Sequence, residues 1–194
     1  CVHSRNCVPG HPESFVPNVP GEWIHPDAAS AEVAMHVALA CPSGAIRVTR
    51  NDGSASSDTA PIVNTVRLRE NGPLAFEAEL QIKGQPQASP RATLCRCGQS
   101  ANKPFCDGAH AAAGFTATGE PGVKEFAALE PRNGPLNVQP LTNGPLMVAG
   151  NLEVVSGTGR TVNKVTKVFL CRCGQSKTKP YCDGSHKAAG FVAE

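Results

Sequence analysis

Two near-copies of one stretch rich in cysteine and histidine constrain this chain more than any other feature. They span residues 95–110 and 171–186, and each places three Cys and one His at the spacing C-x-C-x8-C-x3-H. With the next five residues included, the copies agree at 16 of 21 positions. Thiolates and imidazoles are the ligands of zinc and iron–sulfur centres. The repetition therefore predicts two metal sites of one design.

The nine cysteines also indicate a redox setting. An odd number does not fit a fully paired secreted disulfide framework, and Cys clustered with His is typical of metal ligation in a reducing compartment. We therefore expect a cytoplasmic bacterial protein, or a protein of the mitochondrial matrix if a targeting segment has been removed. The chain starts at Cys1 without a Met, so we also expect a missing N-terminal piece.

The net charge of +2 hides an uneven division of charge. Residues 1–60 carry three Lys or Arg against six Asp or Glu, whereas residues 61–194 carry 15 against 10. This bias is too mild to predict a nucleic-acid partner. No apolar run reaches the roughly 18 residues that a membrane helix needs, so no membrane partner is expected.

Alternating apolar residues between turn signals predict β-strands in the second half of the chain. The tetrapeptide Asn-Gly-Pro-Leu begins at residues 71, 133 and 143 and precedes such stretches. The clearest runs lie between Phe76 and Ile82 and between Val148 and Val154. Leu94 and Leu170 are predicted to end short strands that lead into the two Cys/His loops. Each unit should thus consist of two or three strands and a metal loop.

Each loop continues after its third Cys as Asp-Gly-x-His and then Ala-Ala-Gly-Phe. We expect Asp107 and Asp183 to cap short helices that carry the two His residues in their first turn. Gly114 and Gly190 should end these helices in the left-handed conformation. The helix start then supplies Cys and His from one side of each site, and the extended Cys-x-Cys supplies two ligands from the other.

The front of the chain has a different pattern. A helix is predicted from about Asp27 to Ala40, capped by Asp27 or Ser30, and a strand is predicted from Ala45 to Thr49. Residues 53–64 are rich in small polar residues and are expected to form a linker. This part has three Cys residues. Cys1 and Cys7 lie close together at its start, and Cys41 lies far along the segment in a Cys-Pro pair.

Two Cys in a tight loop followed by a remote Cys-Pro is the ligand layout of bacterial-type ferredoxins. Ser4 stands at the middle position, so the segment resembles the single-cluster, three-cysteine ferredoxins. The resemblance implies a [3Fe–4S] cluster on Cys1, Cys7 and Cys41. A fourth ligand from His3, Ser4 or water would instead complete a [4Fe–4S] cluster. A small domain with three thiols and an empty site is the structural alternative.

The two loops themselves carry a more specific resemblance. The pattern C-x-C-x2-S-x3-P-x-C-D-G-(S/A)-H is similar to that of the CDGSH iron–sulfur family, to which mitoNEET belongs, and it covers most of residues 65–194. The resemblance implies two [2Fe–2S] clusters, each with one iron on two Cys and the other on Cys and His. The implied ligands are Cys95, Cys97, Cys106 and His110 for the first cluster, and Cys171, Cys173, Cys182 and His186 for the second.

The family resemblance also implies an architecture. We expect an α+β fold in which a small, truncated ferredoxin-like segment, residues 1–52, precedes a β-rich pseudo-twofold body. The body would consist of a first CDGSH unit, residues 65–120, and a second, residues 121–194. Family members with one motif form homodimers, so a chain with two motifs is expected to pair them internally and remain a monomer.

The expected function is electron transfer or cluster transfer, with redox proteins or apo iron–sulfur acceptors as partners and with clusters that are less stable in acid. No Gly-rich phosphate loop, nucleophile elbow or H-E-x-x-H occurs, so no enzyme activity is expected. The main alternative is a zinc-binding structural or RNA-binding module with Cys3His sites.

Four basic residues lie inside the motifs, Arg96, Arg172, Lys103 and Lys179. They either offset cluster charge and steer acidic partners or are solvated loop charges.

Overall fold

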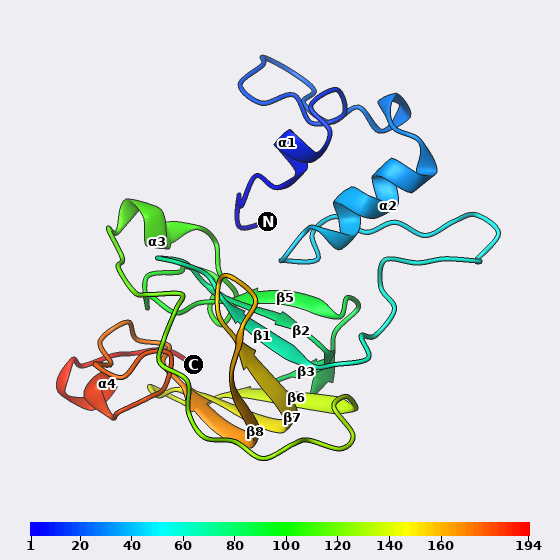
Figure 1. Cartoon of the computed structure of the whole chain (residues 1–194). Coiled ribbons are helices and arrows are strands. Elements are labelled where there is room, and N and C mark those ends of the chain that lie inside the picture. The colour runs from blue at the N-terminus through cyan, green and yellow to red at the C-terminus, as the bar shows by residue number, and fades with distance from the viewer.

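The computed structural model describes residues 1–194 and is a mixed α+β, sheet-rich fold (Figure 1). Four short α-helices and one 3-10 helix accompany eight strands. The helices are α1 (Cys7–Gly10), the 3-10 helix η1 (Pro26–Ala28), α2 (Ala31–Leu39), α3 (Ala109–Ala112) and α4 (Ser185–Ala188). The strands are β1 (Thr65–Leu68), β2 (Leu74–Glu77), β3 (Glu79–Ile82), β4 (Gln85–Pro86), β5 (Arg91–Leu94), β6 (Pro135–Pro140), β7 (Leu146–Val155) and β8 (Thr161–Leu170).

All eight strands belong to one curled sheet. The order is β4-β3-β6-β7-β1-β2-β5, and β8 pairs with β7 outside this path. Within each half of the sequence neighbouring strands pair antiparallel, as in β1 with β2, β2 with β5, β6 with β7 and β7 with β8. The halves are joined by two parallel pairs, β1 with β7 and β3 with β6. Each half thus pairs two of its strands with strands of the other half.

The predicted apolar alternation forms the core of this sheet. Eighteen buried residues make one cluster, and it includes Phe76, Leu80, Val148 and Val154. Strands β5 and β8 end at Leu94 and Leu170, as predicted, and both residues are fully buried. The register of β7 against β8 shifts between Ala149 and Leu152, where Gly150 has a φ of +123°. A Cβ at Gly150 would lie 2.5 Å from the Pro135 carbonyl oxygen, so a side chain does not fit there.

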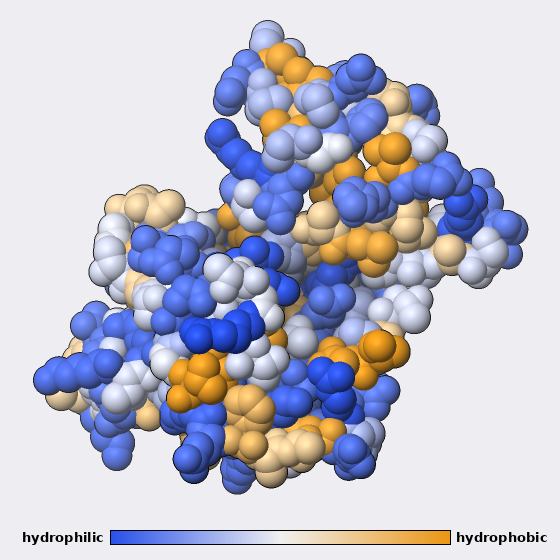
Figure 2. All heavy atoms as spheres, viewed as in Figure 1, coloured by the Kyte–Doolittle hydropathy of each residue, from blue (hydrophilic) through white to orange (hydrophobic).

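The front segment, residues 1–52, forms a separate lobe beside the sheet, with α1 and α2 above β5 in Figure 1. The predicted helix from Asp27 to Ala40 is shorter in the structure, because Ser30 is extended (φ −67°, ψ 160°) and separates η1 from α2. Ser30 is the cap, since its side chain accepts a hydrogen bond from Val33 N at 3.3 Å. Apolar side chains of this lobe remain exposed, among them Val19, Ile24 and Leu39. Figure 2 shows apolar residues, in orange, scattered over the lobe.

The strand predicted from Ala45 to Thr49 is absent. The chain there makes only one isolated bridge, between Thr49 and Ser56, around a turn held by Ser57 N and Val48 O at 2.8 Å. The prediction was wrong because three β-branched residues, Ile46, Val48 and Thr49, suit a strand locally, but no neighbouring strand extends beyond this turn to pair with them.

A buried arginine joins the lobe to the sheet. Arg91 of β5 is 4 % exposed and donates hydrogen bonds to Ala38 O at the end of α2 and to Ser57 O, the latter at 3.2 Å. Asn64 is fully buried at the start of β1 and donates to Gly134 O and Asn151 O, at 2.8 and 3.0 Å. None of the helices has the length and hydrophobicity needed to span a membrane.

Candidate metal centres

Each Cys/His loop brings its four predicted ligands together as two pairs. In the first motif the sulfurs of Cys95 and Cys97 lie 3.7 Å apart, and Cys106 Sγ lies 3.4 Å from His110 Nδ1. In the second motif the corresponding distances are 3.8 Å and 3.4 Å. All nine cysteines are free thiols. The loops therefore hold reduced donors in paired positions.

The pair distances fit tetrahedral metal ions. A tetrahedral ion with metal–sulfur bonds of about 2.3 Å holds two sulfurs about 3.8 Å apart, and a sulfur and a nitrogen slightly closer. No group of three or more His, Cys, Asp or Glu side chains is arranged around a single ion position. Two ligands per ion at two neighbouring positions is the donor arrangement that a two-iron cluster requires, and the residues present fit this group.

The arginine between the first two cysteines of each motif is buried and not solvated. Arg96 and Arg172 are 1 % and 0 % exposed. Arg96 donates to carbonyl oxygens of the turn at residues 69–72 and of the segment that follows the loop, those of Gly72 (2.9 Å), Arg69 (2.6 Å), Thr118 (3.2 Å) and Ala117 (3.2 Å). Arg172 makes the matching set with Gly144 (3.0 Å), Leu141 (2.6 Å), Glu194 (3.1 Å) and Ala193 (3.3 Å). We call these two arginines the arginine clamps.

The clamps explain why Asn-Gly-Pro-Leu recurs before each motif. The turn at Gly72 or Gly144 presents its carbonyls to the guanidinium, and the planar fork of Arg suits several acceptors at once. Phe115 and Phe191 then cover the guanidinium groups, with ring centroids 5.5 and 5.4 Å away. Sequence reasoning missed this role, although the Arg and the turn recur together in both units.

Burial lowers the pKa of Arg96 to about 10 and lowers that of Arg172 as well. Both remain cationic near neutral pH. The negative charge of the Cys171 thiolate raises the pKa of Arg96, and that of the Cys95 thiolate raises the pKa of Arg172. Each clamp therefore places a positive charge near the first cysteine of the other motif, where it offsets thiolate charge.

In the pair formed by Cys95 and Cys97, one thiol ionises easily and the other resists ionisation. A hydrogen bond with Cys97, together with the backbone amides of Ser100, Gly98 and Cys97, lowers the pKa of Cys95 to about 6 against the effect of burial. The same hydrogen bond and burial raise the pKa of Cys97. Burial raises the pKa of Cys106 and of Cys173. A bound metal cation would overcome these raised pKa values, because a thiol that coordinates a metal is deprotonated.

Short polar side chains fix the loop around the third cysteine. Ser100 Oγ donates to Phe105 O, and Ser176 Oγ donates to Tyr181 O, both at 2.6 Å. Asp107 accepts hydrogen bonds from the amides of Ala101 (2.7 Å) and Ala109 (3.0 Å). Asp183 accepts the same pair from Lys177 (2.8 Å) and Ser185 (3.0 Å). Each aspartate thus ties the loop to the first turn of the His-bearing helix.

The cap of that helix differs from the prediction. The residues at the N-cap are Gly108 and Gly184, in the left-handed conformation with φ of +93° and +88°, and neither Asp is the cap. The aspartates bind one residue further out, because a glycine is needed to turn the chain between Cys and His. The predicted left-handed glycines after the helices are confirmed, with φ of +60° at Gly114 and +59° at Gly190.

The two motifs also touch each other. Cys97 and Cys173 form an isolated antiparallel bridge. A Cβ on Gly98 would lie 2.7 Å from Cys173 O, and one on Gly174 would lie 2.6 Å from Cys97 O. Because both glycines also have φ near +80° (82° and 81°), this close approach of the two loops needs glycine on both sides.

The three cysteines of the front segment line one cavity of about 450 Å³. Cys41 is buried, Cys7 is half-buried and Cys1 is exposed. Burial opposes ionisation of Cys41, but hydrogen bonds from Ser43 and from the amides of Ile46, Ser43 and Ala45 outweigh it and lower its pKa. His3 and Ser4, the alternative fourth ligands, line the same cavity. The donors and the space are therefore those that a cluster needs.

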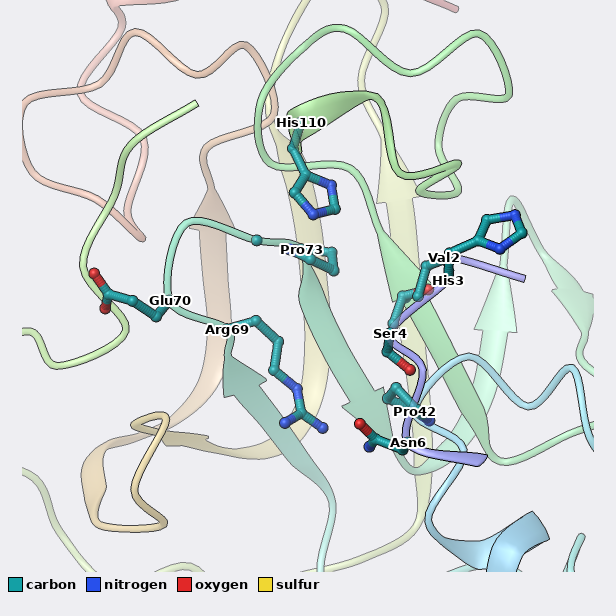
Figure 3. Close-up of a pocket in the computed structure, with 11 residues that line it drawn as sticks. Val2, His3, Ser4, Asn6, Pro42, Arg69, Glu70, Pro73 and His110 are labelled. Carbon is teal, nitrogen blue, oxygen red and sulfur yellow. The ribbon is translucent and has the colours of Figure 1, made fainter. Parts of the chain in front are cut away.

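A second cavity, of about 240 Å³, lies between the front segment and the first motif. Figure 3 shows His110 pointing into it beside Pro73, with Val2, His3, Ser4 and Asn6 on the opposite wall. Three of those residues, His3, Ser4 and Asn6, also line the three-cysteine cavity. One loop thus separates the front cavity from His110.

The matches to known families agree with this arrangement. The family model described as "Iron-binding zinc finger CDGSH type" matches residues 66–111 and 143–187, and "Divergent 4Fe-4S mono-cluster" matches residues 1–51. The chain belongs to the CDGSH iron–sulfur family, with a divergent ferredoxin-like segment in front. The comparison with curated proteins found no match.

Membership of the CDGSH family makes this chain an iron–sulfur protein. The family is generally one of non-catalytic proteins that transfer electrons or handle clusters. Each matched CDGSH region contains all three Cys and the His of its loop and ends before the Gly-Phe that follows. The mono-cluster match contains Cys1, Cys7 and Cys41.

Proposed function

We propose that this chain is an electron-transfer protein with two [2Fe–2S] clusters in the CDGSH loops and a third cluster in the front segment. The proposed ligands are Cys95, Cys97, Cys106 and His110 for the first loop, and Cys171, Cys173, Cys182 and His186 for the second. Cys1, Cys7 and Cys41 are the proposed ligands of the front cluster. A bound cluster supplies a one-electron couple. Redox proteins are the proposed partners.

The observation that carries this proposal is the division of each ligand set into two pairs. The two sulfur–sulfur distances of 3.7 and 3.8 Å and the two sulfur–nitrogen distances of 3.4 Å suit one ion each. A closed zinc site would need all four donors around one ion, and such a grouping is absent. The pairing therefore favours a two-iron cluster over the zinc-binding alternative.

The imidazole ligands set the expected redox and acid behaviour. A neutral His in place of a thiolate removes a negative charge and raises the reduction potential. Potentials should therefore lie above the roughly −400 mV of all-Cys plant-type ferredoxins, toward those of centres with two His. Because an imidazole binds iron only when it is unprotonated, the sites should lose their hold on the cluster as the pH falls.

Cluster donation to apo iron–sulfur proteins is the second candidate function. It is favoured by the partial exposure of both His residues and of Cys182, whereas Cys95, Cys97, Cys171 and Cys173 are buried. An accessible, proton-sensitive ligand in an otherwise buried set provides a point at which the cluster is released.

We further propose that the two units form a pseudo-twofold body within one monomer. The reciprocal strand pairs, β1 with β7 and β3 with β6, support this, as do the matched clamps and the contact between Cys97 and Cys173. The proposed divisions of the chain are the ferredoxin-like segment, 1–52, the linker, 53–64, and the two CDGSH units, 65–120 and 121–194. A reducing compartment, the bacterial cytoplasm or the mitochondrial matrix, is the proposed setting.

Analysis of iron, sulfide and zinc in protein purified without oxygen tests the proposal. We expect two irons and two sulfides per CDGSH loop, a red-brown absorbance spectrum, and further iron that is lost in Cys7→Ser. Absorbance should decay faster at about pH 5.5 than at about pH 8, and His110→Cys with His186→Cys should remove this difference. A colourless protein with one zinc per loop would show that the proposed function is wrong.

Transfer experiments separate the two candidate functions. An electron carrier should be reduced by a partner reductase and reoxidised by air, over repeated cycles, with no loss of iron. A cluster donor should instead lose its absorbance while an apo-ferredoxin gains it. Cys106→Ser and Cys182→Ser are matched controls, because each removes one ligand from one loop.

A further inference from the structure

The two CDGSH loops are alike in ligands but differ in what covers them. Gly108 in the first loop faces the front segment, where a Cβ would lie 3.5 Å from Val2 O. The same position in the second loop, Gly184, has nothing within 4 Å. Accordingly Cys106 is buried and Cys182 is only half-buried. The front segment therefore shields the first loop and leaves the second open.

The two CDGSH loops also differ in the charge of the residues around their Cys and His side chains. Lys177 and Lys187 of the second loop are exposed, and the equivalent residues of the first loop are Ala101 and Ala111. Asp183 binds the amide of Lys177 and the first turn of α4, which carries Lys187, so it holds both lysine-bearing segments together. The open loop is thus also the more basic one.

A third exposed lysine lies against the second loop but comes from outside the Cys/His motif. Lys124 Nζ lies 3.7 Å from the ring centroid of Tyr181, and Lys124 N donates to Val162 O at 2.9 Å. The first loop has Phe105 at the position of Tyr181. Three exposed ammonium groups therefore surround the second loop, and we call Lys124, Lys177 and Lys187 the lysine surface.

We propose that the second CDGSH loop is the docking site of this chain and that the lysine surface selects an acidic protein as its partner, while the front segment keeps the first loop from binding it. The inference rests on the proposed function, since it names which of the two loops meets the redox partner. Opposite charge on the two surfaces speeds encounter and fixes orientation.

A single-stranded nucleic acid would also be attracted by lysines, but the loop does not suit it. Base recognition by such surfaces relies on aromatic rings that are free to stack. The ring of Tyr181 is half-buried, is covered by Lys124, and accepts a hydrogen bond from Asn163 at its hydroxyl (3.0 Å). Charge without a stacking platform favours a protein partner.

Carbodiimide crosslinking of the full, cluster-loaded chain to an acidic, cluster-loaded plant-type ferredoxin tests the proposal. This reagent joins a lysine amine to a partner carboxylate as an amide, so peptide mass spectrometry reports which lysines lie at the contact. We expect crosslinks at Lys177, Lys187 or Lys124 and none at Lys103. Lys177→Ala with Lys187→Ala should weaken binding about five-fold at low salt, and the effect should shrink as salt rises.

The matched control adds the same charges to the shielded loop. Ala101→Lys with Ala111→Lys places two lysines at equivalent exposed positions, and the stoichiometry should remain one ferredoxin per chain. A second ferredoxin, crosslinks divided equally between the loops, or tighter binding of poly(U) RNA than of ferredoxin would overturn the proposal. Because the iron content is measured first on the same sample, a zinc-containing protein would refute the proposed function separately.

Discussion

The first and second CDGSH loops share their internal construction and differ in their surroundings. The ligand pairs, the arginine clamps and the serine and aspartate hydrogen bonds recur with almost the same distances in both. The cover over Gly108 and the lysines around Asp183 occur once each. The geometry of the Cys and His pairs is thus a property of the repeated sequence, whereas the accessibility of each loop depends on what the rest of the chain places beside it.

The largest expected effect tests the shared part. Arg96→Met and Arg172→Met should each lower the free energy of unfolding by about 3 kcal/mol or more, because several buried carbonyls lose their donor. Urea unfolding measures this loss. Arg160→Met is the control, since Arg160 is exposed and its contact with Glu120 is 4.0 Å, so its loss should be small. A clear difference between the two clamp variants would break the equivalence of the loops.

A smaller effect is expected at Glu153, where the two units differ. Its buried carboxylate accepts hydrogen bonds from Arg132 (2.8 Å) and Thr161 (3.2 Å) and pairs with Lys164 (3.2 Å), whereas the equivalent residue in the first unit is Gln81. Glu153→Gln should cost about 2 kcal/mol of unfolding free energy near neutral pH. Gln81→Glu, which lacks these partners, should not stabilise the protein.

The pH dependence of the Glu153 effect follows from its ionisation. Burial alone would raise the pKa of Glu153, but its hydrogen bonds with Arg132, Lys164 and Thr161 outweigh burial and lower the pKa. A lowered carboxyl pKa contributes stability above the unfolded value of about 4.3, and this is lost as the pH falls through the folded pKa. The difference between wild type and Glu153→Gln should therefore shrink in acid, and a constant difference would contradict the ionic role.

The serine hydrogen bonds should give the next effect. Ser100→Ala and Ser176→Ala each leave a carbonyl and an amide of the loop without their partner. We expect each to lower the unfolding free energy by about 1 kcal/mol. Equal values, measured by urea unfolding, would support the view that the loops are built alike, and a value near zero at one of them would not.

The smallest expected effect tests the shielding of the first loop by the front segment at Val2. In the wild type, acid should release iron from the open second loop a few-fold faster than from the first, giving two phases of absorbance loss. Val2→Asp places a charge at a 7 % exposed position against the first loop and should bring the two rates together. Val192→Asp, at a 78 % exposed position, should leave both phases unchanged. Two phases that persist in Val2→Asp would show that the cover does not cause the difference.

Much of the fold was predictable because it depends on local pattern. The alternation from Phe76 to Ile82 gave its strands, since one face of a sheet is buried. The strand predicted from Ala45 to Thr49 was wrong, because pairing depends on a neighbour that the local sequence does not specify. The helix cap was misplaced by one residue, because both Asp and Gly suit the turn and only the backbone conformation at Gly108 decides between them.

The sequence by itself predicted the proposed ligand sets and determined the duplication of the loops and the chemical family, because the Cys/His spacing and the side-chain chemistry are written locally in each copy. Tertiary structure decided the rest. It buried the arginine clamps, placed β1 beside β7 and β3 beside β6, and laid Val2 over the first loop. These contacts join residues far apart in the chain, and their energy depends on packing that no single stretch encodes.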